Sequence, residues 1–126
     1  LSYTPYQQMS YGEARRILLA RAMVHRASLM ILDEPCTGLD IPTRETFLET
    51  MEKMSRKGTR MIYVTHRIEE IMPCFTHVLY LKNGKVFKQG RKEAMMSTKI
   101  LSRALDCSIT VEKNFNRYYA AIDYKK

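Results

Sequence analysis

The order of apolar segments along the sequence predicts an α/β fold. One observation is Leu29–Leu32, a short continuous apolar run of the kind that forms a strand buried on both faces of a parallel sheet. A second is that this run lies between two segments with apolar residues at helical spacing. A third is Arg60–Thr65, a strand-like segment that follows the second helix. Strand, helix and strand in this order predict a parallel sheet with right-handed crossovers.

The two expected helices have clear start signals. Ser10 and Glu13 match the capping-box pattern S-x-x-E, so the first helix is expected to begin there and to run to about His25. The second is expected to begin after Asp40, a good N-cap residue, with Pro42 in its first turn. Its expected apolar stripe consists of Phe47, Leu48, Met51 and Met54, and Gly58 ends it.

The segments after the second strand predict a short helix and a β-hairpin. The helix is expected over Ile68–Met72, because a proline follows it. The hairpin is expected from two strands, His77–Leu81 and Lys85–Lys88, which are joined through Asn83-Gly84. Asn-Gly between apolar segments is a strong signal for a tight hairpin turn.

The last third of the chain predicts a helix and a second hairpin. Arg91–Leu105 is expected to be helical, with a break near Ser97. Ser108–Glu112 and Arg117–Ile122 alternate like paired strands. We expect this hairpin to pack on the preceding helix. The candidates for burial on it are Tyr119 and Ile122.

Composition restricts the class of protein. The 126 residues suit one domain, and 45% apolar with 27% charged residues is ordinary for a soluble globular protein. No apolar run approaches the roughly 18 residues of a membrane span. The first residues lack an initiator Met and the pattern of a signal peptide, so a fragmentary chain is expected. Three scattered cysteines, Cys36, Cys74 and Cys107, argue against a disulfide framework or a zinc site and favour a reducing cytoplasm.

The basic charge raises the question of a nucleic-acid partner. The formal net charge is +8, and a strongly basic protein is a candidate for binding nucleic acid. The Lys and Arg residues are spread along the chain, however, and adjacent pairs such as Arg15-Arg16 are short. The sequence therefore disfavours nucleic acid as a partner, although a basic patch formed on folding stays open.

Polar residues follow both predicted parallel strands. Asp33 and Glu34 come directly after the first strand, and His66 comes after the second. In parallel sheets, ligands bind beyond the carboxyl ends of the strands, so these three residues are expected near one edge. Each residue taken alone has a structural explanation: an acidic pair can form a turn, a lone histidine is more often structural, and Ser10 with Glu13 can be only a helix cap.

Taken together and in order, these motifs resemble those of the ABC ATPase family. Met9–Glu13 is similar to the signature sequence LSGGQ, Leu29–Glu34 to Walker B, Gly38–Asp40 to the D-loop and His66 to the switch histidine. The resemblance covers roughly residues 5 to 95 and implies a partial P-loop NTPase three-layer fold with additional C-terminal β-hairpins. It implies two parts: residues 1–96 as the C-terminal half of the ATPase domain, and residues 97–126 as a helix and hairpin extension with a coupling or regulatory role.

The resemblance also implies roles for individual residues. Hydrolysis of a phosphoanhydride needs charge neutralisation and a positioned water. Asp33 would hold Mg²⁺ through water, Glu34 would orient or deprotonate the attacking water, and His66 would contact the γ-phosphate. In the family, the signature helix binds the γ-phosphate of a nucleotide held by the other subunit. The implied site is therefore catalytic Glu34 and His66, metal-binding Asp33, and cofactor-binding Ser10, Gly12, Glu13 and Asp40.

Two departures from the family pattern bear on activity. Within the signature, Met9, Tyr11 and Glu13 stand where the family has Leu, Gly and Gln. Tyr11 adds bulk and Glu13 adds negative charge beside the expected phosphate. The pattern G-x-x-x-x-G-K-S/T of the P-loop does not occur in these 126 residues. The chain alone is therefore expected to be inactive.

The function implied for the full-length protein is hydrolysis of ATP to power an ABC transporter. The cofactors implied are ATP and Mg²⁺. The partners implied are a second ABC ATPase subunit, with which it forms a dimer, and membrane permease subunits. The location implied is cytoplasmic, at the inner face of the cell membrane. Two alternatives stay open: a non-transport ABC ATPase acting on ribosomes or nucleic acid, and an interaction module that does not hydrolyse ATP.

Overall fold

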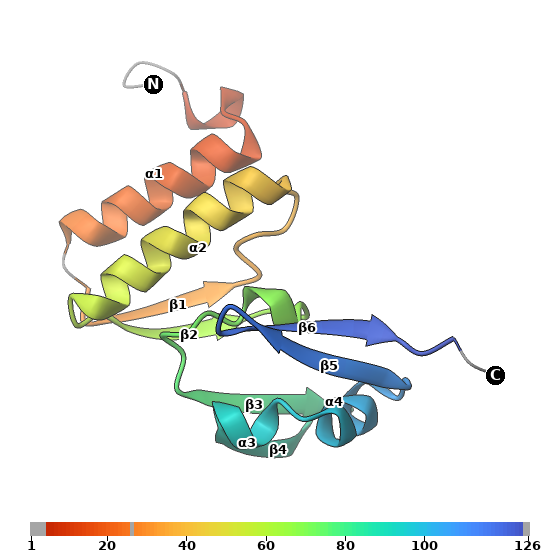
Figure 1. Cartoon of the computed structure of the whole chain (residues 1–126). Coiled ribbons are helices and arrows are strands. Elements are labelled where there is room, and N and C mark those ends of the chain that lie inside the picture. Colours follow the sequence, from red (N-terminus) through yellow and green to blue (C-terminus); the bar gives the residue numbers. More distant parts are fainter. Residues whose placement is uncertain (1–4, 26, 125–126) are drawn as a thin grey trace. The chain divides into compact units, whose positions relative to one another are not determined.

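The computed structural model describes residues 5–25 and 27–124. The chain divides into two compact units, residues 1–66 and residues 67–126 (Figure 1). The described part of the first unit contains one pair of parallel strands, and that of the second contains two antiparallel hairpins. The predicted α/β class is thus confirmed as a mixed fold with a small parallel pair. The boundary expected at residue 97 lies inside the second unit and stays a prediction.

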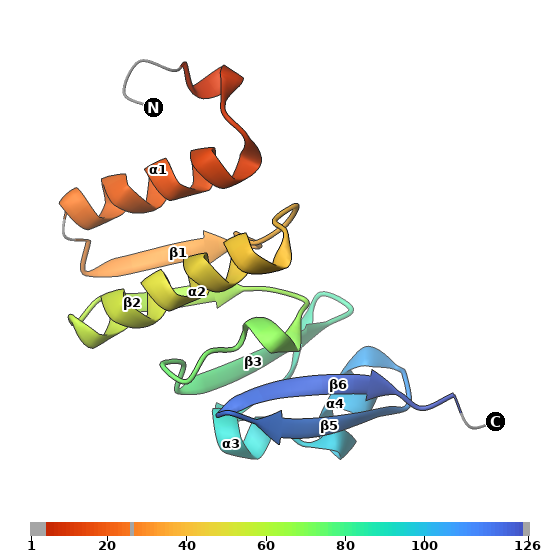
Figure 2. The same cartoon turned by 45° about the horizontal axis from the view of Figure 1, so that its top comes forward.

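The first unit follows the predicted order of helices and strands. Its elements are the 3₁₀ turn η1 (Tyr6–Gln8), α1 (Tyr11–Val24), β1 (Leu29–Asp33), α2 (Ile41–Arg56) and β2 (Arg60–Val64). The two strands pair in parallel, from Leu29 opposite Arg60 to Asp33 opposite Val64. The helix α2 connects them and is drawn over the strand pair in Figure 2, and α1 lies beside α2 in Figure 1. This is the strand–helix–strand crossover that the sequence predicts.

The core of the first unit is formed mainly by one face of α2. The stripe expected from helical spacing is buried, with Leu48 and Met51 at 0% exposure. Leu19 of α1 and Met30 of β1 are buried as well. The complete set of buried hydrophobic side chains in these elements is Leu19, Met30, Phe47, Leu48, Met51 and Met54. Helical periodicity was therefore sufficient to identify the inward face of α2.

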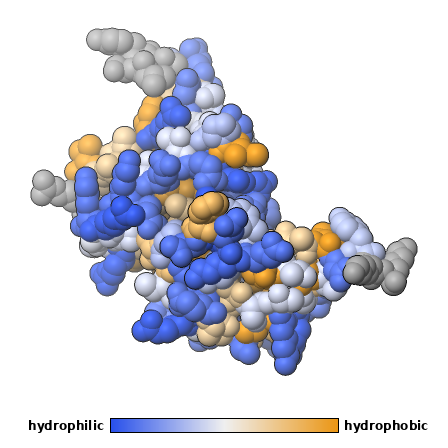
Figure 3. All heavy atoms as spheres, viewed as in Figure 1, coloured by the Kyte–Doolittle hydropathy of each residue, from blue (hydrophilic) through white to orange (hydrophobic). Residues whose placement is uncertain are grey.

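The other face of the parallel pair is exposed, so the prediction that Leu29–Leu32 is buried on both faces is wrong for this chain. Ile31 is 68% exposed and its cross-strand neighbour Ile62 is 50% exposed. Leu29 and Val64 lie on the same face and are also exposed. Within the first unit, the helices bury only one side of a two-stranded sheet. In Figure 3, apolar residues likewise reach the surface in separate patches on the face drawn.

We expect the isolated chain to self-associate through this apolar face. A contiguous apolar surface on a sheet with unpaired edges favours pairing with another copy. Sedimentation velocity over a tenfold or wider range of concentration should show a weight-average mass that rises with concentration. The double variant Ile31→Thr/Ile62→Thr keeps β-branched residues and should shift the protein toward monomer. A concentration-independent monomer in the parental chain would contradict this expectation.

The second unit begins with a short turn and continues with the two hairpins and two helices. Its elements are η2 (Ile68–Glu70), β3 (His77–Lys82), β4 (Lys85–Arg91), α3 (Lys92–Met95), α4 (Thr98–Leu105), β5 (Ile109–Asn114) and β6 (Arg117–Ile122). The predicted helix at Ile68–Met72 is a shorter 3₁₀ turn. The predicted break near Ser97 is confirmed, because its hydroxyl accepts the N–H of Ile100 at 3.2 Å and so caps α4.

The terminal hairpin packs as expected, but through different side chains. Leu101 of α4, Ile109 of β5 and Tyr118 of β6 form a buried cluster with Met96. The prediction of burial for Tyr119 and Ile122 is wrong, since they are 42% and 51% exposed. Tyr118 is 6% exposed instead. Adjacent side chains on a strand point to opposite faces, so the sheet that buries Tyr118 necessarily exposes Tyr119. Ile122 shares the inward face but lies at the end of the pairing, opposite Ile109.

Candidate functional site

The carboxyl ends of β1 and β2 bring the predicted catalytic residues together. Asp33 ends β1 opposite Val64, and the N–H of Glu34 donates to the carbonyl of Val64 at 2.8 Å. His66 follows β2 by two residues, and its Nδ1 lies 2.7 Å from Oε1 of Glu34. The sequence expectation that these residues share one edge of the sheet is confirmed as a matter of geometry. Their catalytic roles stay predictions.

The contact between Glu34 and His66 depends on an unusual backbone conformation. Glu34 has φ of 44°, in the left-handed region that non-glycine residues seldom adopt. The side chains of His66 and Glu34 are 66% and 45% exposed. Exposed ion pairs contribute little to stability, so stability does not explain why the chain maintains a strained turn here. Such backbone outliers cluster at functional sites.

Asp33, the residue predicted to bind Mg²⁺, lies at the end of β1. Its side chain is exposed and borders a hollow of about 380 Å³ between α1 and β1. Arg15 and Asp33 are the charged residues in the lining, which is otherwise apolar. Within the described ranges, no three His, Cys, Asp or Glu side chains gather as a metal cage. One exposed carboxylate fits Mg²⁺, which proteins commonly bind through one or two carboxylates together with water and phosphate oxygens.

The N-terminus of α1 has the capping box predicted from sequence. The hydroxyl of Ser10 accepts the N–H of Glu13 at 3.2 Å, and the N–H of Ser10 donates to Oε2 of Glu13 at 3.0 Å. The hydroxyl hydrogen of Ser10 can still donate to a ligand, because Ser10 is exposed and its oxygen acts here as an acceptor. The carboxylate of Glu13 accepts a hydrogen bond within the cap, so Glu13 stabilises the start of α1. A contact of Glu13 with phosphate stays a prediction.

The residues between Ser10 and Glu13 pack against the first turn of α2 and the segment before it. A Cβ on Gly12 would lie 3.2 Å from Cγ2 of Thr43, so a larger residue would crowd α2. Gly38 has φ of 79°, and a Cβ there would lie 3.8 Å from the Tyr11 ring. The Arg15 guanidinium stands over that ring, 5.8 Å from its centroid. The bulk that Tyr11 adds to the signature sequence therefore contacts the D-loop-like segment, although Tyr11 is 63% exposed.

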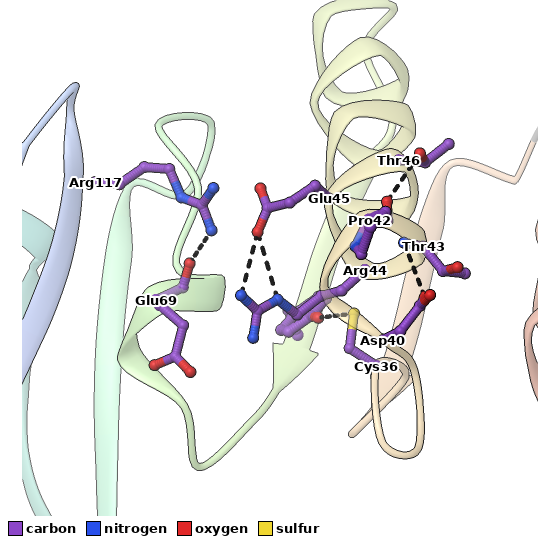
Figure 4. Close-up of polar contacts among 10 residues, drawn as sticks. Cys36, Asp40, Pro42, Thr43, Arg44, Glu45, Thr46, Glu69 and Arg117 are labelled. Carbon is purple, nitrogen blue, oxygen red and sulfur yellow. Dashed lines mark hydrogen bonds and ion pairs between the residues drawn. The ribbon is translucent and has the colours of Figure 1, made fainter.

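Asp40 caps α2 as predicted. Its Oδ1 accepts the N–H of Thr43 at 3.1 Å (Figure 4). Hydrogen bonds from the side chain and then the backbone of Thr43 hold the pKa of the Asp40 carboxyl below its ordinary value. The family resemblance implies that Asp40 lies at a subunit interface. The described residues show that it is exposed at a helix N-terminus, and its role at an interface stays a prediction.

This cap should make stability depend on pH in the acidic range. Since the pKa of Asp40 is lowered on folding, its contribution is fully present above the unfolded-state pKa of about 4 and is lost as the pH falls through the folded-state pKa. Asp40→Asn keeps an acceptor but does not titrate there. We expect the stability difference between the parent and Asp40→Asn to shrink from pH 6 to pH 3, measured by urea denaturation. A difference that grows on acidification would contradict this assignment.

A buried thiol beside the site was not anticipated from sequence. Cys36 is 1% exposed, and its Sγ lies 3.3 Å from the hydroxyl of Tyr63 on β2. This contact joins the segment after Glu34 to the second strand. In the sequence, only the position of Cys36, two residues after the acidic pair, indicates that this thiol lies near the site. The partner lies 27 residues away, a separation that local sequence patterns do not report.

Comparisons with known proteins agree with the motifs. Residues 1–37 match the family model described as ABC transporter. An uncharacterized ABC transporter ATP-binding protein of Bacillus subtilis, YlmA, is 43% identical over 114 residues, which cover 89% of this chain and 43% of YlmA. YmeB of Lactococcus lactis, described in the same words, is 34% identical, with 90% of this chain and 45% of YmeB covered. The chain thus spans less than half the length of these curated relatives.

Solved structures show the same fold. An ABC transporter of metal-chelate type in an inward-facing conformation superposes with a TM-score of 0.78 at 19% identity, covering 95% of this chain and 49% of that chain. CbiO1 from Clostridium perfringens, part of the ABC transporter complex CbiONQ, gives 0.62 at 28% identity, covering 82% and 41%. None of the described helices is both long and apolar enough to cross a membrane. On the ordered motifs, the geometry of the strand ends and these similarities, the chain belongs to the ABC transporter ATP-binding protein family.

Proposed function

We propose that the full-length protein containing this chain hydrolyses ATP to power an ABC transporter, and that this chain supplies the C-terminal half of its nucleotide-binding domain. The observation on which the proposal rests is the 2.7 Å contact between Glu34 and His66 at the carboxyl ends of two parallel strands. The contact places a carboxylate and an imidazole on one accessible edge. This pair can act on a water molecule and on a phosphate at the same time.

Each residue of the pair has a distinct task in this proposal. Glu34 orients the attacking water and accepts its proton, and His66 contacts the γ-phosphate. Asp33 would hold Mg²⁺, which would supply neutralisation of the charge on the phosphates. The exposure of both side chains in the Glu34–His66 pair leaves room for nucleotide and water to approach.

The signature helix serves a second nucleotide site in this proposal. Ser10 and Gly12 lie at the exposed N-terminus of α1, where a hydroxyl, backbone N–H groups and the helix dipole favour a phosphate. They would bind the γ-phosphate of ATP held by a second ABC ATPase subunit, with Glu13 and Asp40 in the same interface. The completed domain would have the three-layer P-loop NTPase fold, of which the parallel pair and its helices are one part.

Permease subunits in the membrane complete the proposed assembly. The relatives' own descriptions support this: CbiO1 is part of a transporter complex, and the molybdenum import ATP-binding protein ModC of Photorhabdus laumondii is 30% identical. The proposed location is therefore the cytoplasmic face of the cell membrane. The substrate is set by subunits other than this one.

The experiment that tests the proposal compares the full-length protein with the isolated chain. We expect the full-length protein to hydrolyse ATP in the presence of Mg²⁺. The isolated chain should show neither hydrolysis nor tight ATP binding by titration calorimetry, because the P-loop supplies most phosphate contacts. Micromolar binding of ATP by the isolated chain would contradict the proposal that the P-loop supplies most of the contacts to ATP. Absence of Mg²⁺-dependent hydrolysis by the full-length protein would refute the function itself.

A further inference from the structure

The turn that contains Glu34 has a backbone conformation that its surroundings must hold in place. Glu34 has φ of 44°, in the left-handed region, and the next residue is a proline, whose ring restricts the backbone of the residue before it. A conformation of this kind costs free energy and persists only where neighbouring groups fix it. The contacts of this turn therefore determine where the Glu34 side chain lies.

Backbone hydrogen bonds fix the peptide groups of the turn. The N–H of Glu34 donates to the carbonyl of Val64 at 2.8 Å, and the carbonyl of Glu34 accepts the N–H of Thr37 at 3.3 Å. The N–H of Leu39 donates to the carbonyl of Cys36 at 3.2 Å. Of these three bonds, the first joins the turn to β2, and the other two lie within the segment that leads to α2.

A side-chain contact joins the turn to β2 at a second point. The hydroxyl of Tyr63 lies 3.3 Å from Sγ of Cys36, and either atom can be the donor (the dashed line at Cys36 in Figure 4). Cys36 is 1% exposed, and Pro35 is fully buried as well. Tyr63 directly precedes Val64, so two successive residues of β2 contact the turn, one through its hydroxyl and one through its carbonyl.

The path from Cys36 back to Glu34 is short and stiff. Two residues span at most about 7 Å of extended chain. Between them lies Pro35, whose ring fixes its φ at about −65° and whose side chain is fully buried. Few rotatable bonds therefore remain in which a shift of Cys36 can be absorbed, and a change in the position of Cys36 moves the Glu34 carboxylate.

The contact between Tyr63 and Cys36 is suited to fix geometry rather than to add stability. A thiol is a weak donor and its sulfur a weak acceptor, so the hydrogen bond itself contributes little. Tyr63 also lies three residues before His66, whose Nδ1 is 2.7 Å from Oε1 of Glu34. It is thus linked to both members of the pair, to Glu34 through Cys36 and to His66 along the chain.

We propose that Tyr63 is a positioning residue for Glu34. Its hydroxyl holds Cys36, and Cys36 holds the Glu34 carboxylate within hydrogen-bond reach of the attacking water, as a general base requires. A small displacement of a catalytic group lowers the rate strongly. The proposal rests on the proposed role of Glu34 as the general base. Tyr63 acts through Cys36 without touching nucleotide, so ATP binding should not depend on its hydroxyl.

The test uses the full-length protein, with kcat and KM for ATP measured separately. Tyr63→Phe keeps the ring and removes the hydroxyl. It should lower kcat by about three- to tenfold, a loss within the range of coupling between residues in contact, and leave KM within about twofold. Cys36→Ala should cause a similar loss. Cys36→Ser keeps a donor and an acceptor and should lose less; a loss equal to that of Cys36→Ala would contradict the proposal.

A matched control separates positioning from a general loss of stability. Tyr80 is also half-buried, and its hydroxyl donates to the carbonyl of Met95 at 2.9 Å and contacts Sδ of Met96 at 3.4 Å. Tyr80→Phe therefore makes the same chemical change at another bonded hydroxyl and should keep the parental kcat. If Tyr80→Phe lowers kcat as much as Tyr63→Phe does, the positioning role is refuted.

The combination with Glu34→Gln distinguishes failure of this inference from failure of the proposed function. If Tyr63 acts through Glu34, adding Tyr63→Phe to Glu34→Gln should cause no further loss of kcat. If the two losses multiply, or if Tyr63→Phe alone keeps the parental kcat, the positioning role is refuted while the proposed function stands. If Glu34→Gln keeps the parental rate, the role of Glu34 and the inference built on it are both refuted.

Discussion

Replacing Glu34 by Gln in the full-length protein is expected to lower ATP hydrolysis by about 10²–10⁴-fold, the usual effect of removing a general base. The amide has nearly the same shape and can still hydrogen-bond to water and to His66, which lies 2.7 Å away in the parent. It cannot accept a proton from the attacking water. ATP binding should persist, because the substitution leaves the P-loop and Asp33, the proposed Mg²⁺-binding residue, unchanged.

The comparison needs a matched carboxylate that is outside the site. Glu49→Gln makes the same chemical change at an exposed position on α2 and should keep the parental rate. Hydrolysis is followed by phosphate release and ATP binding by calorimetry, on both variants and the parent. A Glu34→Gln protein that hydrolysed ATP at the parental rate would overturn the role assigned to Glu34 and, with it, the proposed mechanism.

Replacing Ser10 by Arg is expected to abolish ATP-dependent dimer formation. Glu34→Gln should accumulate a closed dimer, because the bound γ-phosphate is no longer removed. In that background, Ser10→Arg puts bulk and charge at the exposed N-terminus of α1, where the phosphate of the partner subunit is expected. Nucleotide should still bind to each monomer. Size-exclusion chromatography with ATP and Mg²⁺ should therefore show a dimer for Glu34→Gln and a monomer for the double variant.

Loss of the helix cap must be separated from loss of the interface. Ser97 caps α4 with the same bond that Ser10 makes to α1, a hydroxyl accepting an N–H at 3.2 Å. Ser97→Arg should therefore cost a similar amount of stability, typically about 1 kcal/mol for a cap, and still allow the dimer. If Ser97→Arg prevents dimerisation as completely as Ser10→Arg, the effect comes from destabilisation, and Ser10 loses its assigned place at the interface.

Features set by neighbouring residues were predictable from the sequence. The caps at Ser10, Asp40 and Ser97 involve a partner three residues away, so the local pattern contains the whole interaction. The turn at Asn83-Gly84 needs positive φ at both residues, and both have it. The pairing of β1 with β2 followed from the order of segments, since parallel neighbours need a crossover such as α2.

Features that join distant residues were not predictable. The contact of Cys36 with Tyr63 and that of Arg117 with Glu69 link positions 27 and 48 residues apart, and neither residue type is distinctive at its position. The choice between Tyr118 and Tyr119 depended on which face of β6 meets α4. The exposure of Ile31 depended on how many layers the sheet has, which the apolar run alone does not specify.

The motif residues illustrate how function and packing overlap. The family resemblance assigns Gly12 and Glu13 to nucleotide binding. In the structure Gly12 is also the residue that lets α1 approach Thr43, and Glu13 completes the capping box. A substitution at either position would therefore lower stability as well as any nucleotide contact. A role in nucleotide binding is easier to separate from a role in stability at Ser10, because Ser97 makes an equivalent helix cap and serves as a control.

The bond between His66 and Glu34 has a consequence for the count of protons in the site. With Nδ1 facing Glu34, Nε2 is the ring nitrogen left for a phosphate oxygen. In the neutral tautomer with hydrogen on Nδ1, Nε2 has no hydrogen to donate. In the other tautomer, Nδ1 bonds to Glu34 only if that carboxyl is protonated, and it then cannot act as a base. In the proposed site, His66 can therefore bond to an ionised Glu34 through Nδ1 and donate to a phosphate through Nε2 at the same time only as an imidazolium.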